Sequence, residues 1–108
     1  MLNSKRESVI ITSALPYANG EIHLGHISST YLPADIFRRF LKLSGVEVYH
    51  LCASDDFGTP VLIETEKKKV KPEDYVKYWH DKDLEDFSSA GIVFDSFSQT
   101  SSETNRKF

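Results

Sequence analysis

The stretch that decides the fold is V-I-I-T-S-A-L-P-Y-A-N-G-E-I-H-L-G-H, from Val9 to His26. It begins with an apolar, β-branched run typical of a strand. After it, residues 27–43 have the pattern of a helix that ends at Gly45. A strand, a tight loop and a helix in this order open many doubly wound α/β domains. We therefore predict an α/β fold with a parallel, Rossmann-like sheet.

The junction between the predicted loop and helix carries His23, Gly25 and His26. A helix N-terminus has unpaired N–H groups that attract phosphate, and a glycine lets a flat ligand approach the backbone. Two imidazoles can donate hydrogen bonds to oxygens that gain negative charge. The junction thus indicates a phosphate-binding site. Two plainer readings stay open: the histidines cap the helix, and Gly25 serves helix–strand packing.

The other elements are predicted from the spacing of apolar residues and from the prolines, glycines and capping residues between them. Strands are expected at 8–13, 46–53 and 92–94, and the β-branched first strand is expected to be buried on both faces. Helices are expected at 59–69 and 72–90, the first with Thr59 as cap and Pro60 as first residue. Pro33 predicts a kink or a fresh helix start. Thr100 and Glu103 resemble a capping box that starts a further helix.

The apolar residues of each predicted helix indicate which face it buries. On the helix at 27–43 the expected inward set is Tyr31, Ala34, Ile36, Phe37, Phe40, Leu41 and Leu43. On the helix at 72–90 it is Tyr75, Tyr78, Trp79, Leu84 and Phe87. Two basic clusters, Arg38-Arg39-Lys42 and Lys67–Lys69, are interpreted as solvated helix faces rather than contacts to nucleic acid. His50, Cys52 and His80 are interpreted as structural.

Composition narrows the class of protein. The chain has 108 residues and a net charge of −3, which suits one small domain and no strong basic field for nucleic acid. Cys52 is the only cysteine, which excludes an intrachain disulfide and makes a zinc site unexpected. No apolar run reaches membrane-spanning length, and no secretory signal opens the chain. The expected setting is soluble and cytoplasmic, without a membrane partner.

The motifs resemble a known family. The segment Ala14–His26 contains the His-x-Gly-His signature of class I aminoacyl-tRNA synthetases, and its A-L-P-Y-A-N-G lead-in is similar to the methionine-specific members. The likeness continues through 29–35, 54–60 and 101–107, and the stretch Ser29–Pro33 looks like the archaeal and eukaryotic branch. It implies ATP-dependent activation of methionine to methionyl-adenylate and transfer to tRNA(Met).

The resemblance also implies site residues. His23 and His26 would be catalytic and would bind ATP together with Tyr17 and Gly25. Ala14, Leu15, Tyr17 and Asp55 would bind methionine, with Asp55 holding its ammonium group. For Ala14 and Leu15 a plain core position stays open, and so does a helix-capping or loop role for Asp55. For Asn19 and Gly20 the alternatives are a ligand-shaping loop and a simple turn.

The second motif departs from the family. Where members more often show Asp-Glu-His-Gly-Thr-Pro, this chain has Asp55-Asp56-Phe57-Gly58-Thr59-Pro60. Phe57 can neither donate nor accept a hydrogen bond, so no functional role is assigned to it. The polar role of Asp56 is left open.

The resemblance implies that residues 1–108 form the N-terminal half of the Rossmann-like catalytic domain in a larger enzyme. ATP would arrive with Mg²⁺, the fragment itself would hold no metal, and zinc would bind only in the missing part. Most tRNA contacts would lie there too, and the fragment alone would be inactive, with exposed apolar sheet surface that favours self-association. One alternative is a truncated, non-catalytic synthetase-like binding module. Another is an unrelated nucleotidyltransferase that shares only the His-x-Gly-His motif.

Overall fold

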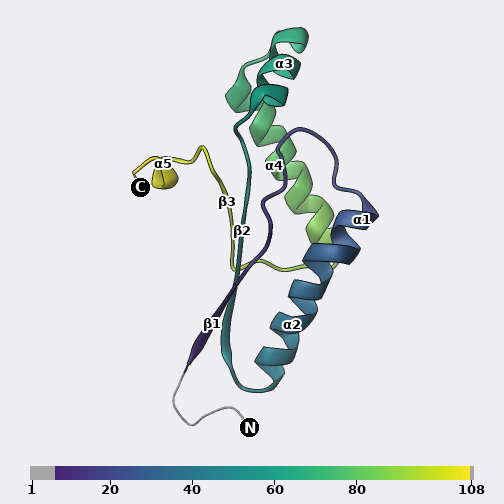
Figure 1. The fold of residues 1–108 in the computed structure, drawn as a ribbon, viewed down its shortest axis with the longest axis vertical. Coiled ribbons are helices and arrows are strands. Elements are labelled where there is room, and N and C mark those ends of the chain that lie inside the picture. Colours follow the sequence, from purple (N-terminus) through teal and green to yellow (C-terminus); the bar gives the residue numbers. More distant parts are fainter. Residues whose placement is uncertain (1–6, 108) are drawn as a thin grey trace.

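Three parallel strands form the sheet of the computed structural model, which describes residues 7–107. The strands β1 (Ser8–Thr12), β2 (Glu47–Ser54) and β3 (Ser96–Gln99) lie side by side in that order (Figure 1). Both neighbouring pairs, β1 with β2 and β2 with β3, are parallel. The predicted α/β class and parallel sheet are confirmed.

Helices make both connections between the strands. The first comprises α1 (Leu24–His26), the π-helix η1 (Ile27–Tyr31) and α2 (Leu32–Leu43), and the second comprises α3 (Thr59–Lys68) and α4 (Pro72–Ser89). The short helix α5 (Glu103–Arg106) follows β3. Crossovers that advance in one direction with the usual right hand place their helices on one face, and α2 and α4 lie on the same side of the strands in Figure 1.

The other face of the sheet is open. Along β2, Val48, His50, Cys52 and Ser54 are buried, whereas the residues between them are exposed or half-buried. On β1, Ile10 is 63% exposed. The expectation that the first strand is buried on both faces is therefore wrong. Helices cover one face only, so its β-branched residues reflect strand propensity rather than double burial.

The first helical segment begins at Leu24, earlier than the predicted 27, and contains a π turn. The N–H of Leu32 bonds the carbonyl oxygen of Ile27, one residue beyond the α-helical partner. Pro33 then falls in the first turn of α2, where its missing N–H costs little. The helical backbone nevertheless runs without a break from Leu24 to Leu43. The predicted fresh start at Pro33 is therefore wrong, and the local irregularity is the π turn just before the proline.

The face that α2 buries differs from the predicted one. Its buried residues are Asp35, Arg38 and Leu41, and Tyr31 precedes them on the same side. Four residues expected to face inward are exposed: Ile36, Phe37, Phe40 and Leu43. The helix therefore turns a polar stripe toward the segment at 91–95 and an apolar stripe toward solvent.

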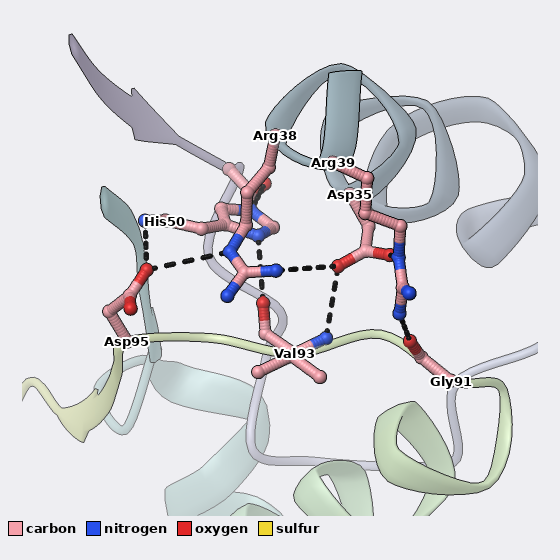
Figure 2. A network of polar contacts seen from close by, with 8 residues as sticks. Asp35, Arg38, Arg39, His50, Gly91, Val93 and Asp95 are labelled. Atoms are coloured by element: carbon pink, nitrogen blue, oxygen red, sulfur yellow. Dashed lines mark hydrogen bonds and ion pairs between the residues drawn. The ribbon is translucent and has the colours of Figure 1, made fainter. Parts of the chain in front are cut away.

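A buried polar network explains this orientation (Figure 2). The Asp35 carboxylate accepts hydrogen bonds from the Val93 N–H at 3.1 Å and from Arg39 Nε at 2.6 Å. Arg38 lies 3.6 Å from Asp95 Oδ2 and 4.0 Å from Asp35 Oδ1. The interpretation of Arg38 as part of a solvated basic face is wrong, because its side chain is 8% exposed between two carboxylates.

The same network explains why the third strand begins later than predicted. The predicted strand at 92–94 is irregular, and β3 begins at Ser96. Asp35 takes the Val93 N–H, and the Val93 carbonyl oxygen faces His50 Nδ1 at 3.3 Å. These backbone groups are therefore satisfied by side chains rather than by a strand ladder. Pairing with β2 starts only where the Asp95 N–H bonds the His50 carbonyl oxygen.

Two predicted caps are also wrong. Thr59 is the first residue of α3, and Gly58 (φ 138°) is its N-cap. The cap of α5 is Ser102, whose side chain accepts the Asn105 N–H. The hydroxyl of Thr100 instead accepts the N–H of Asp56 at 2.9 Å. It therefore ties the end of β3 to the loop after β2.

Two small cores form beneath the helices. One contains Ala18, Val61, Tyr75 and Val76, with Trp79 against it; the other contains Tyr31, Cys52, Phe87 and Ile92. The burial predicted for Tyr75 and Phe87 is confirmed. Tyr78 and Leu84 are exposed instead, because α4 turns His80 and Asp83 inward.

Candidate active site

The loops that follow β1 and β2 meet at the carboxyl-terminal edge of the sheet. Tyr17 and Asp55 form an isolated parallel bridge. The Asp55 N–H donates to the Pro16 carbonyl oxygen at 2.7 Å, and the Ala18 N–H donates to the Asp55 carbonyl oxygen at 2.9 Å. Ligands of open α/β sheets bind at this edge. The two motifs singled out in the sequence therefore lie on one edge.

A cleft of about 430 Å³ opens beside the first loop. Of the predicted site residues, Ala14, Leu15, Tyr17 and His26 line it. Leu15 is 48% and Tyr17 61% exposed, and Ala14 is also exposed. None of the three is a core residue, which removes the plain reading that was open for Ala14 and Leu15.

The two histidines stack on each other. Their ring centroids are 3.7 Å apart, and both side chains are exposed. His23 Nδ1 accepts the N–H of Gly25 at 3.0 Å, so in the neutral ring the proton is on Nε2. His23 therefore caps α1 and still has a donor to offer. His26 lines the cleft, whereas His23 and Gly25 lie in the same turn without lining it.

The ring of His23 lies close over Gly25. A Cβ on this residue would lie 2.8 Å from Cε1 and 2.9 Å from Nδ1 of the His23 ring. Such contacts force the ring to move. The glycine thus allows the ring to lie over the backbone of the first turn, and the approach of a ligand to Gly25 stays a prediction.

Asp55 lies beside the cleft rather than in its wall. It is half-buried, and its Oδ1 accepts the Phe57 N–H at 3.3 Å. This is a local loop contact. The bridge to Tyr17 places Asp55 next to a cleft residue. The structure therefore shows the loop role of Asp55, and its role in binding stays a prediction.

Asp56 and Phe57 have opposite environments. Asp56 is buried, and its carboxylate accepts hydrogen bonds from Ser54, Gln99 and Ser101. It fastens the loop after β2 to the end of β3. Phe57 is 61% exposed. The departure from the family motif thus leaves Asp56 with a structural task.

Sequence reasoning missed how the floor of the cleft is held. Tyr31 and Thr30 also line it, and the Tyr31 hydroxyl donates to the Ala14 carbonyl oxygen at 2.6 Å. Burial, with Cys52 and Asp83 nearby, raises the pKa of Tyr31 to about 12. The helical pattern marked Tyr31 only as apolar. Its hydroxyl could have been noticed as a buried group that requires a partner.

Buried titratable groups lie behind the site. Burial raises the pKa of the Cys52 thiol to about 11, and Cys52 is a buried residue of the second core, in agreement with its structural interpretation. Within residues 7–107 no three His, Cys, Asp or Glu side chains gather closely enough to hold a metal ion. No helix in that range is long and apolar enough to cross a bilayer.

Known proteins are similar along nearly the whole chain. The family model of class I tRNA synthetases (M) matches residues 9–108. A methionine–tRNA ligase of Chlorobium phaeovibrioides is 46% identical over 101 residues, which are 94% of this chain and 14% of the relative. One from Methanococcus aeolicus is 45% identical over 96 residues, 89% of this chain and 14% of that protein.

A solved structure has the same fold. Methionyl-tRNA synthetase of Mycobacterium tuberculosis, in complex with methionyl-adenylate, superimposes with a TM-score of 0.88 at 24% identity. The match covers 94% of this chain and 20% of that one. The chain thus spans about one seventh of the length of the two ligases and one fifth of the solved chain. Its architecture is that of the Rossmann-like fold of the solved enzyme. On the match of the family model and the identity of these relatives, the chain belongs to the methionine group of the class I tRNA synthetases.

Proposed function

We propose that residues 1–108 are the N-terminal half of the catalytic domain of a methionine–tRNA ligase, and that the cleft after β1 receives ATP and methionine. The observation that carries this proposal is the gathering of Ala14, Leu15, Tyr17 and His26 in one cleft. The Mycobacterium tuberculosis relative was solved with methionyl-adenylate, the compound that such a cleft would have to hold.

His23 and His26 would meet the phosphates of ATP. The stacked pair lies at the start of the helical segment that runs from Leu24 to Leu43, where the backbone adds a partial positive charge. Because Nδ1 of His23 accepts the Gly25 N–H, its Nε2–H can donate to a phosphate oxygen. The pair would stabilise charge that develops on phosphate oxygens while pyrophosphate departs, with Tyr17 and Gly25 beside the nucleotide.

Methionine would lie against the first loop. The exposed aromatic ring of Tyr17 offers a face to the thioether sulfur, and Ala14 and Leu15 offer apolar contact. Asp55, bridged to Tyr17, would hold the ammonium group by a charge-assisted hydrogen bond. The carboxylate of methionine would then attack the α-phosphorus, and the residues contribute by positioning and by charge.

The remaining expectations belong to the whole enzyme. ATP would bring Mg²⁺ as part of the substrate, a zinc site would lie outside these residues, and tRNA(Met) would bind mainly through other domains. We infer a cytoplasmic protein. These residues alone would bind ligand weakly and would not complete adenylate formation.

Titration of the isotopically labelled chain with a non-hydrolysable methionyl-adenylate analogue tests the proposal. We expect the largest amide shifts at 14–17 and 23–26. Replacing either histidine with alanine should weaken binding, since loss of a comparable transition-state donor costs about 10²–10³ in rate and less in ground-state affinity.

The matched control is Tyr78→Ala, which removes an exposed aromatic side chain that does not line the cleft. Shifts confined to other faces would argue against the site. Binding without any pyrophosphate exchange in the complete protein would favour the non-catalytic module.

A further inference from the structure

A buried serine lies at or directly after the end of each strand that leads into the site. Ser13 directly follows β1 and precedes Ala14, and Ser54 is the last residue of β2 and precedes Asp55. Their exposed fractions are 6% and 0%. Each hydroxyl is paired with a histidine that does not contact the cleft: His50 for Ser13 and His80 for Ser54.

The first pair has a definite proton arrangement. His50 is fully buried, and its Nδ1 faces the Val93 carbonyl oxygen at 3.3 Å. A carbonyl oxygen can only accept, so the ring proton is on Nδ1. Nε2 then accepts the hydroxyl proton of Ser13 across 2.6 Å. The His50 N–H is bonded to Asp95 Oδ2, so the backbone and ring of this histidine are held by the segment at 93–95 (Figure 2).

The second pair is arranged in the opposite sense. The Ser54 hydroxyl donates its one proton to Asp56 Oδ1 at 2.9 Å. Toward His80 Nδ1, also at 2.9 Å, it can only accept. His80 therefore carries its proton on Nδ1 as well. Its ring stacks on Phe97 of β3, with centroids 4.7 Å apart.

Both histidines are suited to remain neutral. Burial lowers the pKa of His50, against opposing effects of Val93 and Asp35, and burial also lowers the pKa of His80. In the neutral form each ring has one donor and one acceptor. The hydrogen bonds of each serine hydroxyl are thus satisfied in a single orientation of its side chain.

We propose that Ser13–His50 and Ser54–His80 are positioning pairs that hold the two halves of the methionine and ATP site, Ala14–Tyr17 and Asp55, in register. The inference rests on the function proposed above. The pairs act through the backbone of the residues that follow each serine, and a displacement of about 1 Å at such a site is costly for binding.

The first test examines the unliganded chain. Nitrogen-15 spectra of the histidine rings at pH 7 report which nitrogen carries the proton. We expect the Nδ1–H tautomer for His50 and His80, and the Nε2–H tautomer for His23, which serves as an internal contrast. An Nε2–H signal from either buried histidine overturns the pairing, and this measurement needs no variant.

The second test measures affinity for the methionyl-adenylate analogue. Ser13→Ala and Ser54→Ala should each raise Kd about tenfold, which equals about 1.4 kcal/mol. Ser13→Thr keeps the hydroxyl and should restore affinity. Ser89→Ala is the control, because that exposed serine bonds only the Glu85 carbonyl oxygen of its own helix.

The outcomes separate the two proposals. Absence of binding by the wild-type chain overturns the proposed function and this inference with it. Wild-type binding with unchanged Kd in both alanine variants overturns the inference alone. If an alanine variant does not fold, the tautomer measurement and the Ser13→Thr affinity decide.

Discussion

Tyr31 in the π turn and Ala14 in the cleft are joined by one hydrogen bond, from the phenol hydroxyl to the carbonyl oxygen, at 2.6 Å. The bond links the helical segment after the first loop to the beginning of that loop. The ring of Tyr31 also packs against Phe87, with centroids 4.6 Å apart. The floor of the cleft is therefore anchored in the second core.

Tyr31→Phe removes this bond and keeps the ring. The free energy of unfolding should fall by about 1 kcal/mol, the usual net value of one hydrogen bond, and the affinity for the adenylate analogue should fall several-fold. Because the pKa of Tyr31 is raised to about 12, the difference should be constant from pH 6 to 9. Urea unfolding at several pH values measures it, with the exposed Tyr78→Phe as control. Equal stability of both variants would contradict the role of the bond.

Gly25→Ala should separate stability from binding. Alanine favours a helix over glycine by up to about 1 kcal/mol, so the free energy of unfolding should be unchanged or higher. The new Cβ would lie 2.8 Å from the His23 ring and displace it, which should weaken ATP binding. Calorimetric titration with a non-hydrolysable ATP analogue checks this. Wild-type affinity in the variant would show that the orientation of His23 is irrelevant.

Asp35→Ala should be strongly destabilising. It leaves the buried Arg38 with Asp95 only and frees the Val93 N–H, and loss of one partner in a buried ion pair costs about 3–5 kcal/mol. The midpoint of thermal unfolding measures the loss. Glu64→Ala breaks an exposed pair with Lys67 and should change stability by less than about 1 kcal/mol. Similar effects of the two substitutions would refute the importance of the network.

Asp83→Asn should stabilise the chain at alkaline pH. Asp83 is fully buried, and neither carboxylate oxygen has a hydrogen-bond partner among the described residues. Burial raises its pKa from 3.8 to about 7, with Asp86 adding and Lys82 opposing. The folded chain therefore binds this proton more tightly than the unfolded chain, and stability falls as pH rises from about 4 through 7.

The asparagine variant lacks this ionisation. Its gain in the free energy of unfolding over wild type should therefore be larger at pH 8 than at pH 5. Urea titrations at both pH values give the comparison, with the exposed Asp81→Asn as control. A gain that does not depend on pH would mean that the carboxyl group does not titrate in this range.

The chain as it stands should self-associate through its apolar stripe on α2. Phe40 is 60% and Leu43 89% exposed there, and contiguous apolar surface of this kind favours association. Sedimentation at increasing concentration should show a rising mean mass, and Phe40→Glu should lower it. Lys42→Gln, on the same helix, lowers the net charge by the same one unit and should have little effect. A monomer at all concentrations would contradict the prediction.

Local patterns allowed much of the fold to be predicted. The spacing of apolar residues predicted the strands at 8–13 and 46–53 and the helices at 59–69 and 72–90. Gly45, Gly91 and the prolines marked the ends of these elements, because each restricts or frees its own backbone. The positions of Ala14, Tyr17, His26 and Asp55 at one edge followed from parallel pairing. The prediction was wrong about which face of α2 is buried and about where the third strand begins. Asp35 and Arg38 are polar, and only their partners at 91–95 make their burial favourable.

The amino-acid sequence by itself determined the order of the elements, the parallel sheet, the family and the residues at the carboxyl-terminal edge of the sheet. These features depend on short-range propensity and on motifs of adjacent residues. The tertiary structure alone decided which side of α2 is buried, where β3 begins and how Ser13 and Ser54 are held. Those outcomes depend on hydrogen bonds between groups 26 to 58 residues apart. Such bonds stabilise the fold only after the chain has folded and both partners have been removed from water.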